Sequence, residues 1–365
     1  MKILGLEVWG QSEGNVSTFF DRLEKETFDY IVLFGQNEWQ YYIAYSTVLD
    51  RAIEEVCVKR NQNLYIFTGA SIINEIDEPT LHPLVKLIKW SEWYFIKTYV
   101  QMCSYAVNND ENIEEVLDYT KNVVDYNKNV YVDDYEYHYI TLNNRAHKHR
   151  CHMMDILAKY NLIDKGAISW ANVHNSNGYD YPWQYWTPQI LQLGTYEANN
   201  KAWGNIPTEY YESFVSLINE STINSVIFSE KTVFALVCGQ PFICVSGPGH
   251  HKFLESMGFE LYDELFDYSF DSETNNNKRT ELVVQNIDRL CKLPISELTN
   301  LKKQIRPKLI RNKQRVKDIA LSPNSYCNII EEVLKLDDIE CATACGWIWH
   351  VFWLLKDCHK DNTLL

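Results

Sequence analysis

The chain has 365 residues, of which 46% are hydrophobic and 14% aromatic, and its formal net charge is −15. That length exceeds what one hydrophobic core usually organises, so the sequence predicts two folded domains. So negative a chain repels polyanions, which argues against a protein that coats nucleic acid over its whole surface.

The first part of the chain alternates short apolar runs with stretches of helical character. Three apolar runs predict parallel strands connected by crossover helices, namely residues 3–8, 30–34 and 64–68. Two later stretches, residues 81–105 and 111–126, are predicted as helices, the first rich in aromatic residues and the second apolar at helical spacing.

After the short acidic segment at residues 131–136 the pattern begins again. A strand at 137–142, a basic loop, a helix at 151–160 and a strand at 166–170 form one complete strand–helix–strand unit. A second unit follows, with a strand at 223–228, a helix at 230–237, a strand at 242–245 and a helix at 250–257.

The remainder of the chain is predicted to be helical. Helices are expected at residues 278–291, at 296–319 with a break or kink near Pro307, and at 325–336. We therefore expect an α/β protein with three parts: a Rossmann-like domain at 1–136, a second one at 137–320, and a helical tail at 321–365 that packs back on the body.

The most apolar stretch, Cys345 to Leu355, is well short of the roughly 20 residues that a membrane-spanning helix requires. It is predicted to be a last helix that packs its aromatic side chains on the body. The ten cysteines are scattered as single residues, and no secretory apolar region follows Met1. Both features favour a cytoplasmic protein with reduced thiols.

A basic loop follows the predicted strand at 137–142 and holds Asn143, Arg145, Lys148 and Arg150. In an open parallel sheet, ligands bind at the carboxyl ends of the strands, where helix N-termini present free N–H groups to anions. Arginine offers a planar fork to phosphate oxygens and lysine a point charge. The loop is therefore a candidate diphosphate site, and the alternative is a solvated basic loop.

A second candidate segment, Ser229-Glu230-Lys231-Thr232, lies between the next predicted strand and helix. Glu230 supplies an acceptor for ribose hydroxyls and Lys231 a cation for phosphate, although a carboxylate at a helix N-terminus is also a common dipole partner. The loop Gly247-Pro248-Gly249 is a third candidate, because backbone without side chains can approach a ligand closely.

These motifs carry a family resemblance. The stretch FSEKTVFALVCGQPFICVSGPGHHKFLESMGFELYDELFDYSFD, residues 228–271, resembles the donor-binding half of fucosyltransferase-like glycosyltransferases of viruses and bacteria. The stretch YITLNNRAHKHRCHMMDILAKYNLIDKGAISW, residues 139–170, is similar to the first strand, basic loop and helix of that half. With the helices that follow, the resemblance covers about half of the chain.

The resemblance implies a GT-B fold and an inverting glycosyltransferase whose donor is a nucleotide-sugar, with the phosphates held by side chains and no metal or other cofactor. By position, Arg145 and Arg150, with Lys148, face the diphosphate, Glu230 the ribose and Lys231 a phosphate. One departure is that the segment 223–228 lacks the acidic residue expected shortly before the Glu-Lys pair.

The acceptor hydroxyl also requires a base, which the GT-B architecture supplies from the N-terminal domain. Glu38 and Glu13 lie in loops after predicted strands and are the candidates, with Glu38 ranked first. Either residue is also a common kind of solvated loop acid.

A basic stretch contrasts with the acidic remainder of the chain and predicts either a solvated helix face or a contact with an anionic acceptor. Its cations are Lys302, Lys303, Arg306, Lys308, Arg311, Lys313, Arg315 and Lys317. With the viral resemblance, this stretch suggests the hydroxymethylated base of viral DNA as an acceptor, beside a glycan or protein.

Two alternatives to this enzyme stay open from the sequence. A non-catalytic protein would keep the nucleotide pocket for sensing or assembly, as the missing acid before Ser229 suggests. A metal-dependent transferase would hold its donor through Asp133 and Asp134, although the spacing of that pair before a strand favours an acidic linker.

Overall fold

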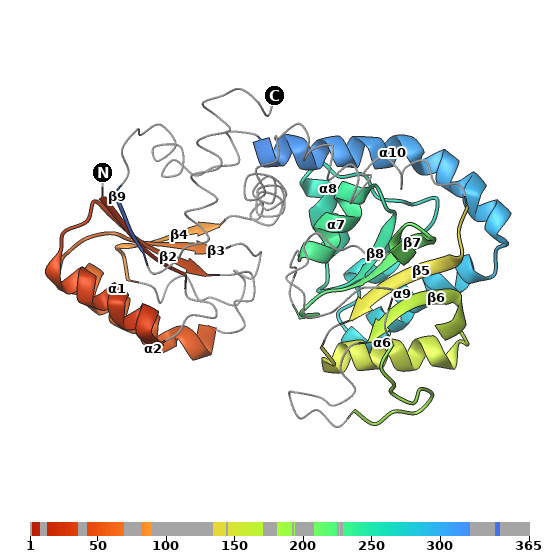
Figure 1. Ribbon diagram of the computed structural model, residues 1–365, viewed down its shortest axis with the longest axis horizontal. Helices are drawn as coiled ribbons and strands as arrows, with labels where there is room; N and C mark the ends of the chain where they lie inside the picture. The colour runs from red at the N-terminus through yellow and green to blue at the C-terminus, as the bar shows by residue number, and fades with distance from the viewer. Residues whose placement is uncertain are drawn as a thin grey trace. The chain divides into compact units, whose positions relative to one another are not determined.

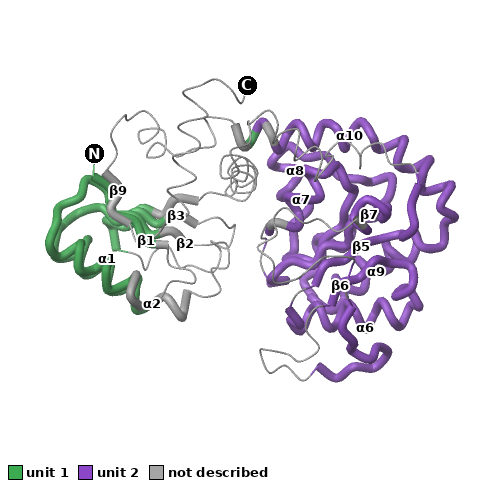
Figure 2. Tube along the Cα trace, in the orientation of Figure 1, with its two compact units in different colours: residues 1–104, 319–365 green, residues 105–318 purple. Residues whose placement is uncertain are grey.

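The computed structural model describes residues 2–7, 13–35, 42–68, 82–89, 134–143, 145–170, 181–191, 193, 208–224, 226, 229–321 and 340–343. These residues form two separate sheets, each built only of parallel strands and accompanied by helices, which confirms the predicted α/β class. The chain divides into two compact units, shown in Figure 2: residues 1–104 with 319–365, and residues 105–318. Residues 101–133 lie outside the described part, so the predicted domain change near residue 136 stays a prediction.

The sheet of the first unit has five strands in the order β4-β3-β2-β1-β9. Its strands are β1 (Lys2–Glu7), β2 (Tyr30–Gly35), β3 (Leu64–Thr68), β4 (Val85–Lys89) and β9 (Glu340–Thr343). Its helices are α1 (Glu13–Lys25) and α2 (Tyr42–Ala52), and α2 continues into a π-helical turn, Ile53–Val58. Because β1, β2 and β3 follow one another across the sheet, right-handed crossovers put α1 and α2 on the same face (Figure 1).

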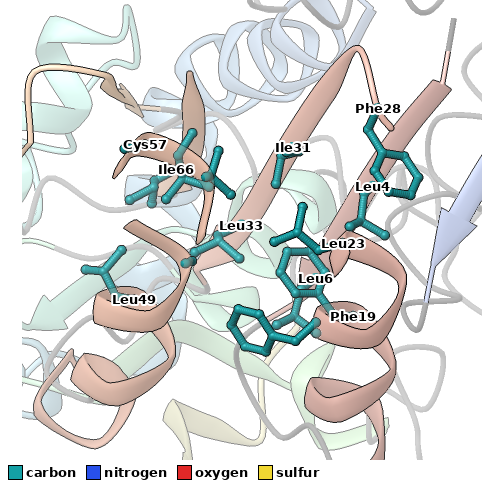
Figure 3. Close-up of a cluster of buried hydrophobic side chains, with 14 residues drawn as sticks. Leu4, Leu6, Phe19, Leu23, Phe28, Ile31, Leu33, Leu49, Cys57 and Ile66 are labelled. Carbon is teal, nitrogen blue, oxygen red and sulfur yellow. The ribbon is translucent and has the colours of Figure 1, made fainter. Parts of the chain in front are cut away.

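The core of the first unit lies between this sheet and its two helices. Leu6 of β1 pairs in register with Leu33 of β2, and both side chains are buried. Phe19 and Leu23, four residues apart on α1, present one apolar face to them (Figure 3). Helical spacing on α1 and apolar runs in the strands therefore bury the same cluster.

Two strands of this sheet correct the sequence analysis. Val85–Lys89 was expected inside a helix, but it forms β4 beside β3. A five-residue segment such as VKLIK, with two lysines among three apolar residues, does not reveal by its periodicity whether it is a helix or a strand, and pairing with β3 decides. Glu340–Thr343 was expected in a helical tail, but it forms β9, which pairs with the outer edge of β1.

The sheet of the second unit has four strands in the order β6-β5-β7-β8. Its strands are β5 (Tyr137–Asn143), β6 (Gly166–Trp170), β7 (Ser213–Asn219) and β8 (Phe242–Val245). Its α-helices are α6 (Lys148–Lys159), α7 (Glu230–Cys238), α8 (His250–Ser256), α9 (Asn276–Cys291) and α10 (Ile295–Leu321). In the described part of this unit, short 3₁₀ turns lie at Ile163–Lys165, Thr208–Tyr210 and Tyr268–Ser272.

In the second unit the strand preceding α7 is not the predicted one. Ile223, Asn224 and Val226 lie outside any strand, and the strand is instead Ser213–Asn219, every residue of which is buried. The prediction was wrong because two serines and an asparagine interrupt the apolar pattern of that segment. Inside the fold the polar groups are used, since Ser213 Oγ donates to the Glu209 carbonyl at 2.7 Å.

The C-terminal helices agree more closely with the sequence. Helix α9 begins where the Asn275 side chain accepts from the Lys278 N–H, and α10 continues through Pro307 without a break. The helices predicted at 111–126, 325–336 and 345–355 lie outside the described residues. Among the described helices, none combines the length and apolar character needed to cross a membrane.

The buried cluster of the first unit leads to a stability prediction. Leu6→Ala should lower the free energy of unfolding by about 2–5 kcal/mol, because it removes buried methyl groups and leaves a cavity among Leu33 and Phe19. Val58→Ala, at a side chain that is 54% exposed, should change it by less than about 0.5 kcal/mol. Urea denaturation measures both, and equal effects would contradict this assignment of the core.

Candidate functional site

The carboxyl edge of the second sheet contains a change in strand order between β5 and β7. The chain moves from β5 to β6 on one side and from β7 to β8 on the other. Right-handed crossovers therefore place α6 and α7 on opposite faces of the sheet (Figure 1). In open α/β sheets, ligands bind outside the carboxyl ends of the strands at such a point.

Helix α6 starts at this point with a strongly basic first turn. Arg145 and Lys148 are exposed, and the turn contains no acidic residue. Arg150 is buried, and its guanidinium donates to the carbonyls of Asn219 and Glu220 at 3.4 and 3.3 Å. Because the N-terminus of a helix already carries a partial positive charge, cations gathered there favour a bound anion.

Helix α7 starts beside the end of β7. Ser229 caps the helix by accepting from the Lys231 N–H at 3.3 Å, and Thr232 is buried. Glu230 is the first residue of the helix, but its side chain lies outside the described part, so its predicted contact with ribose stays a prediction.

Two histidines at the start of α6, His147 and His149, have pKa values that cations of both helix starts lower. The rings of His147 and His149 stack with centroids 5.7 Å apart. Burial, followed by the positive charges of Arg150, Arg145 and Lys231, lowers the pKa of His147 to about 4. Burial, followed by Arg150, lowers the pKa of His149 to about 3. Both rings are therefore neutral at neutral pH, and Lys231 of α7 acts on the same two rings as Arg150 of α6.

The ends of the strands also carry buried oxygens that have no hydrogen-bond partner in the described part of the chain: Asn143 Oδ1, Asn219 Oδ1 and Ser246 Oγ. In the two asparagines the amide nitrogen does have a partner: Asn143 Nδ2 donates to Thr141 Oγ1, and Asn219 Nδ2 donates to the Met153 sulfur. Ile140 pairs with Ser216, and the same register places Asn143 opposite Asn219. Because buried polar atoms are normally hydrogen-bonded, these oxygens require O–H or N–H donors beyond the contacts of the described residues.

The glycine loop after β8 is held by contacts within the chain. Arg279 Nε donates to the Ser246 carbonyl at 2.9 Å, and the backbone N–H groups of His251 and Lys252 donate to the Asp271 carboxylate at 3.1 and 3.0 Å. Asp271 therefore occupies the start of α8, where a phosphate would otherwise bind.

Gly249 has the left-handed φ of 82° that favours glycine, and a Cβ there would meet no atom within 4 Å. Gly247 is buried beside it in the same loop. The expected donor contacts of Gly247 and Gly249 stay predictions.

The predicted base candidates belong to the first unit. Glu13 is the first residue of α1, and its side chain lies outside the described part. Glu38 lies wholly outside the described residues, as does Asp133, whereas Asp134 is exposed just before β5.

The basic stretch of α10 makes many of its contacts within the second unit. Three of its cations pair with neighbouring segments: Lys308 with Glu264, Arg311 with Glu260, and Arg315 with the carbonyl of Met257. Lys302 is buried, with its Nζ 5.8 Å from the centre of the Tyr135 ring. These contacts favour a structural role for α10, and its contact with a DNA acceptor stays a prediction.

Sequence reasoning missed Asn219 and Glu220 because it placed the strand too late in the chain. Glu220 is an acidic residue directly after β7 and nine residues before Ser229. The signal was the segment SFVSLIN, in which Phe, Val, Leu and Ile outnumber the polar residues, followed directly by Glu220.

Comparison with protein-family models, with curated proteins and with solved structures found no match to this chain. The function of the site must then follow from its charge, its burial and its hydrogen bonds.

The buried histidines predict a pH dependence of stability. Their pKa values are lowered in the fold, so the unfolded chain binds protons that the folded chain does not, and acid favours unfolding. Stability should therefore fall as the pH decreases from 6.5 towards about 4, the range between the ordinary and the lowered pKa of His147. Urea midpoints of His147→Asn should fall less steeply over this range, and parallel slopes for variant and wild type would contradict the assignment.

Proposed function

We propose that the protein is a glycosyltransferase that binds the diphosphate of a nucleotide-sugar at the carboxyl edge of its second sheet. The observation that supports this most directly is that three cations act on the neutral His147 ring: Arg145 in the loop before α6, Arg150 of α6 and Lys231 of α7. A diphosphate carries the charge and the oxygens that such a set of donors fits.

The buried oxygens at the strand ends favour a ligand that is more than an inorganic anion. Asn143 Oδ1 and Asn219 Oδ1 can only accept hydrogen bonds, and phosphate oxygens at neutral pH are mostly acceptors as well. An inorganic phosphate alone would therefore leave these two oxygens without a donor. A ribose or a hexose supplies O–H donors beside a diphosphate. A nucleotide-sugar therefore provides donors and acceptors in the combination that this edge of the sheet requires.

The transfer itself follows from charge. The bond between the anomeric carbon and the phosphate oxygen breaks, the acceptor oxygen attacks from the opposite face, and its proton passes to a base. Negative charge grows on the leaving diphosphate, so Arg145 and Lys231 stabilise the transition state more than the ground state.

The resemblance to fucosyltransferase-like enzymes supports the remaining parts of the proposal. They are a GT-B architecture, a base from the first unit at Glu38 or Glu13, phosphates held by side chains, and a glycan, protein or modified DNA base as acceptor.

Binding and turnover test this function directly. The full chain should be incubated with GDP-, UDP-, dTDP- and CMP-sugars, and thermal shift and slow release of free nucleotide should be measured for each. We expect one nucleotide class to raise the unfolding midpoint and to be hydrolysed slowly without an acceptor. No binding and no hydrolysis across the panel would contradict the proposal, whereas binding without turnover with any acceptor would favour a sensing protein. Loss of activity with a chelator would indicate the metal-dependent alternative.

Single substitutions should locate the diphosphate. Arg145→Ala and Lys231→Ala should each weaken binding of the nucleoside diphosphate by about tenfold, because each removes a charge-assisted hydrogen bond to phosphate. Lys165→Ala is the matched control, since this exposed lysine precedes the amino end of β6, at the opposite edge of the sheet. Titration calorimetry measures the three affinities, and an equal loss in the control would point to general electrostatics instead.

A further inference from the structure

Glu220 lies at the junction of the two helix starts that form the candidate site. It follows the last residue of β7, is 0% exposed, and its N–H donates to the Val245 carbonyl of the neighbouring strand at 3.1 Å. Its backbone is therefore fixed to the sheet, directly at the change in strand order.

The backbone carbonyl of Glu220 contacts the start of α6. It accepts from Arg150 Nη2 at 3.3 Å and lies 2.9 Å from His149 Nε2, which must carry the proton because a carbonyl only accepts. The carbonyl of Asn219, one residue earlier, accepts from the same guanidinium nitrogen. The end of β7 thus determines where the first turn of α6 lies.

The side chain of Glu220 contacts the start of α7. Its Oε1 accepts from the Ser229 N–H at 3.2 Å and from the Thr232 hydroxyl at 2.5 Å. Ser229 is the N-cap of α7, so this carboxyl group holds the residue that begins the helix, two positions before Lys231.

We infer that Glu220 is a positioning residue that holds the N-termini of α6 and α7 together, so that Arg150 and Lys231 act on one bound diphosphate. Since the two helices lie on opposite faces of the sheet, their starts need a connection at its edge, and Glu220 contacts one through its backbone and the other through its side chain. This inference rests on the proposed diphosphate site. It adds Glu220, which is not one of the residues proposed to contact the diphosphate.

The physical reason is the cost of misplacing a charged donor. Without the Glu220 carboxyl group, the Ser229 N–H and the Thr232 hydroxyl lose a buried acceptor and the first turn of α7 loosens. The Lys231 side chain would then sample several positions, and the affinity for an anion would fall even though the unit stays folded. Glutamine offers the same acceptor oxygen at the same length and should restore the position.

Asp155 of α6 provides a matched control. It is buried like Glu220, and its carboxylate accepts from three backbone N–H groups, those of Gln184, Tyr185 and Trp186. Truncating Asp155 removes a buried acceptor in the same unit. The segment that this acceptor holds is 184–186, which includes neither the start of α6 nor the start of α7. Asp155→Ala therefore measures what a purely structural loss does.

The experiment compares wild type, Glu220→Ala, Glu220→Gln, Thr232→Val and Asp155→Ala as full chains. Inorganic pyrophosphate, GDP and UDP are the probes, titrated by calorimetry well below the lowest unfolding midpoint. We expect Glu220→Ala to bind about tenfold more weakly and Thr232→Val about threefold more weakly, as the loss of buried hydrogen bonds implies. Glu220→Gln should stay within about threefold of wild type, and Asp155→Ala should lose stability without losing affinity.

The outcomes separate the two proposals. If wild type binds but Glu220→Ala and Thr232→Val bind equally well, or lose no more affinity than Asp155→Ala, Glu220 is only structural and the inference fails alone. If wild type binds none of the probes, the diphosphate site itself fails. Should Glu220→Ala not fold, Thr232→Val decides, because valine keeps the shape of the side chain and removes only the hydroxyl donor.

Discussion

The parallel pairing of β5 with β7 is the constraint on which the candidate site depends. These strands are neighbours in the sheet, yet the chain leaves them towards opposite sides, so their following helices start close together and lie on opposite faces. The carboxyl ends of both strands carry asparagines in register, and the buried Arg150 donates to the last carbonyls of β7. Strand order, helix starts and buried polar groups thereby meet at one edge.

The electrostatics of that edge explain why an anion suits it. Arg145, Lys148 and Arg150 occupy the N-terminal end of α6, where the helix dipole adds to their charge, and Lys231 lies within electrostatic reach of the same histidines. His147 and His149 do not add further charge, because burial and the neighbouring cations hold their pKa values far below neutrality. The start of α8 differs, since Asp271 already supplies its negative partner. Among these helix starts, the basic pair at α6 and α7 is the one that we propose for a diphosphate.

Some elements of the fold could be predicted from the pattern of residues and others could not. Strands such as Leu64–Thr68, Gly166–Trp170 and Phe242–Val245 were predicted at or near their observed bounds, because continuous apolar runs between turn residues identify buried parallel strands. Strand β7 was missed, because serine and asparagine inside a sheet find partners that only the fold supplies. Strand β9 was missed for a related reason, since its pairing with β1 joins residues more than 300 positions apart, as in Lys2 with Glu340.

The sequence by itself determined the α/β class, the alternation of strands and helices in the second unit, and the basic loop from Asn143 to Arg150 that leads into α6. These features depend on local composition and spacing, which a chain carries before it folds. Only the tertiary structure brought the charge of Lys231 to bear on His147, joined the Glu220 carboxyl group to the Ser229 N–H, and paired the cations of α10 with Glu260 and Glu264. Those contacts join residues from separate elements, and strand order and burial decide them, because a side chain's charge and hydrogen bonds depend on neighbours that are distant in the sequence.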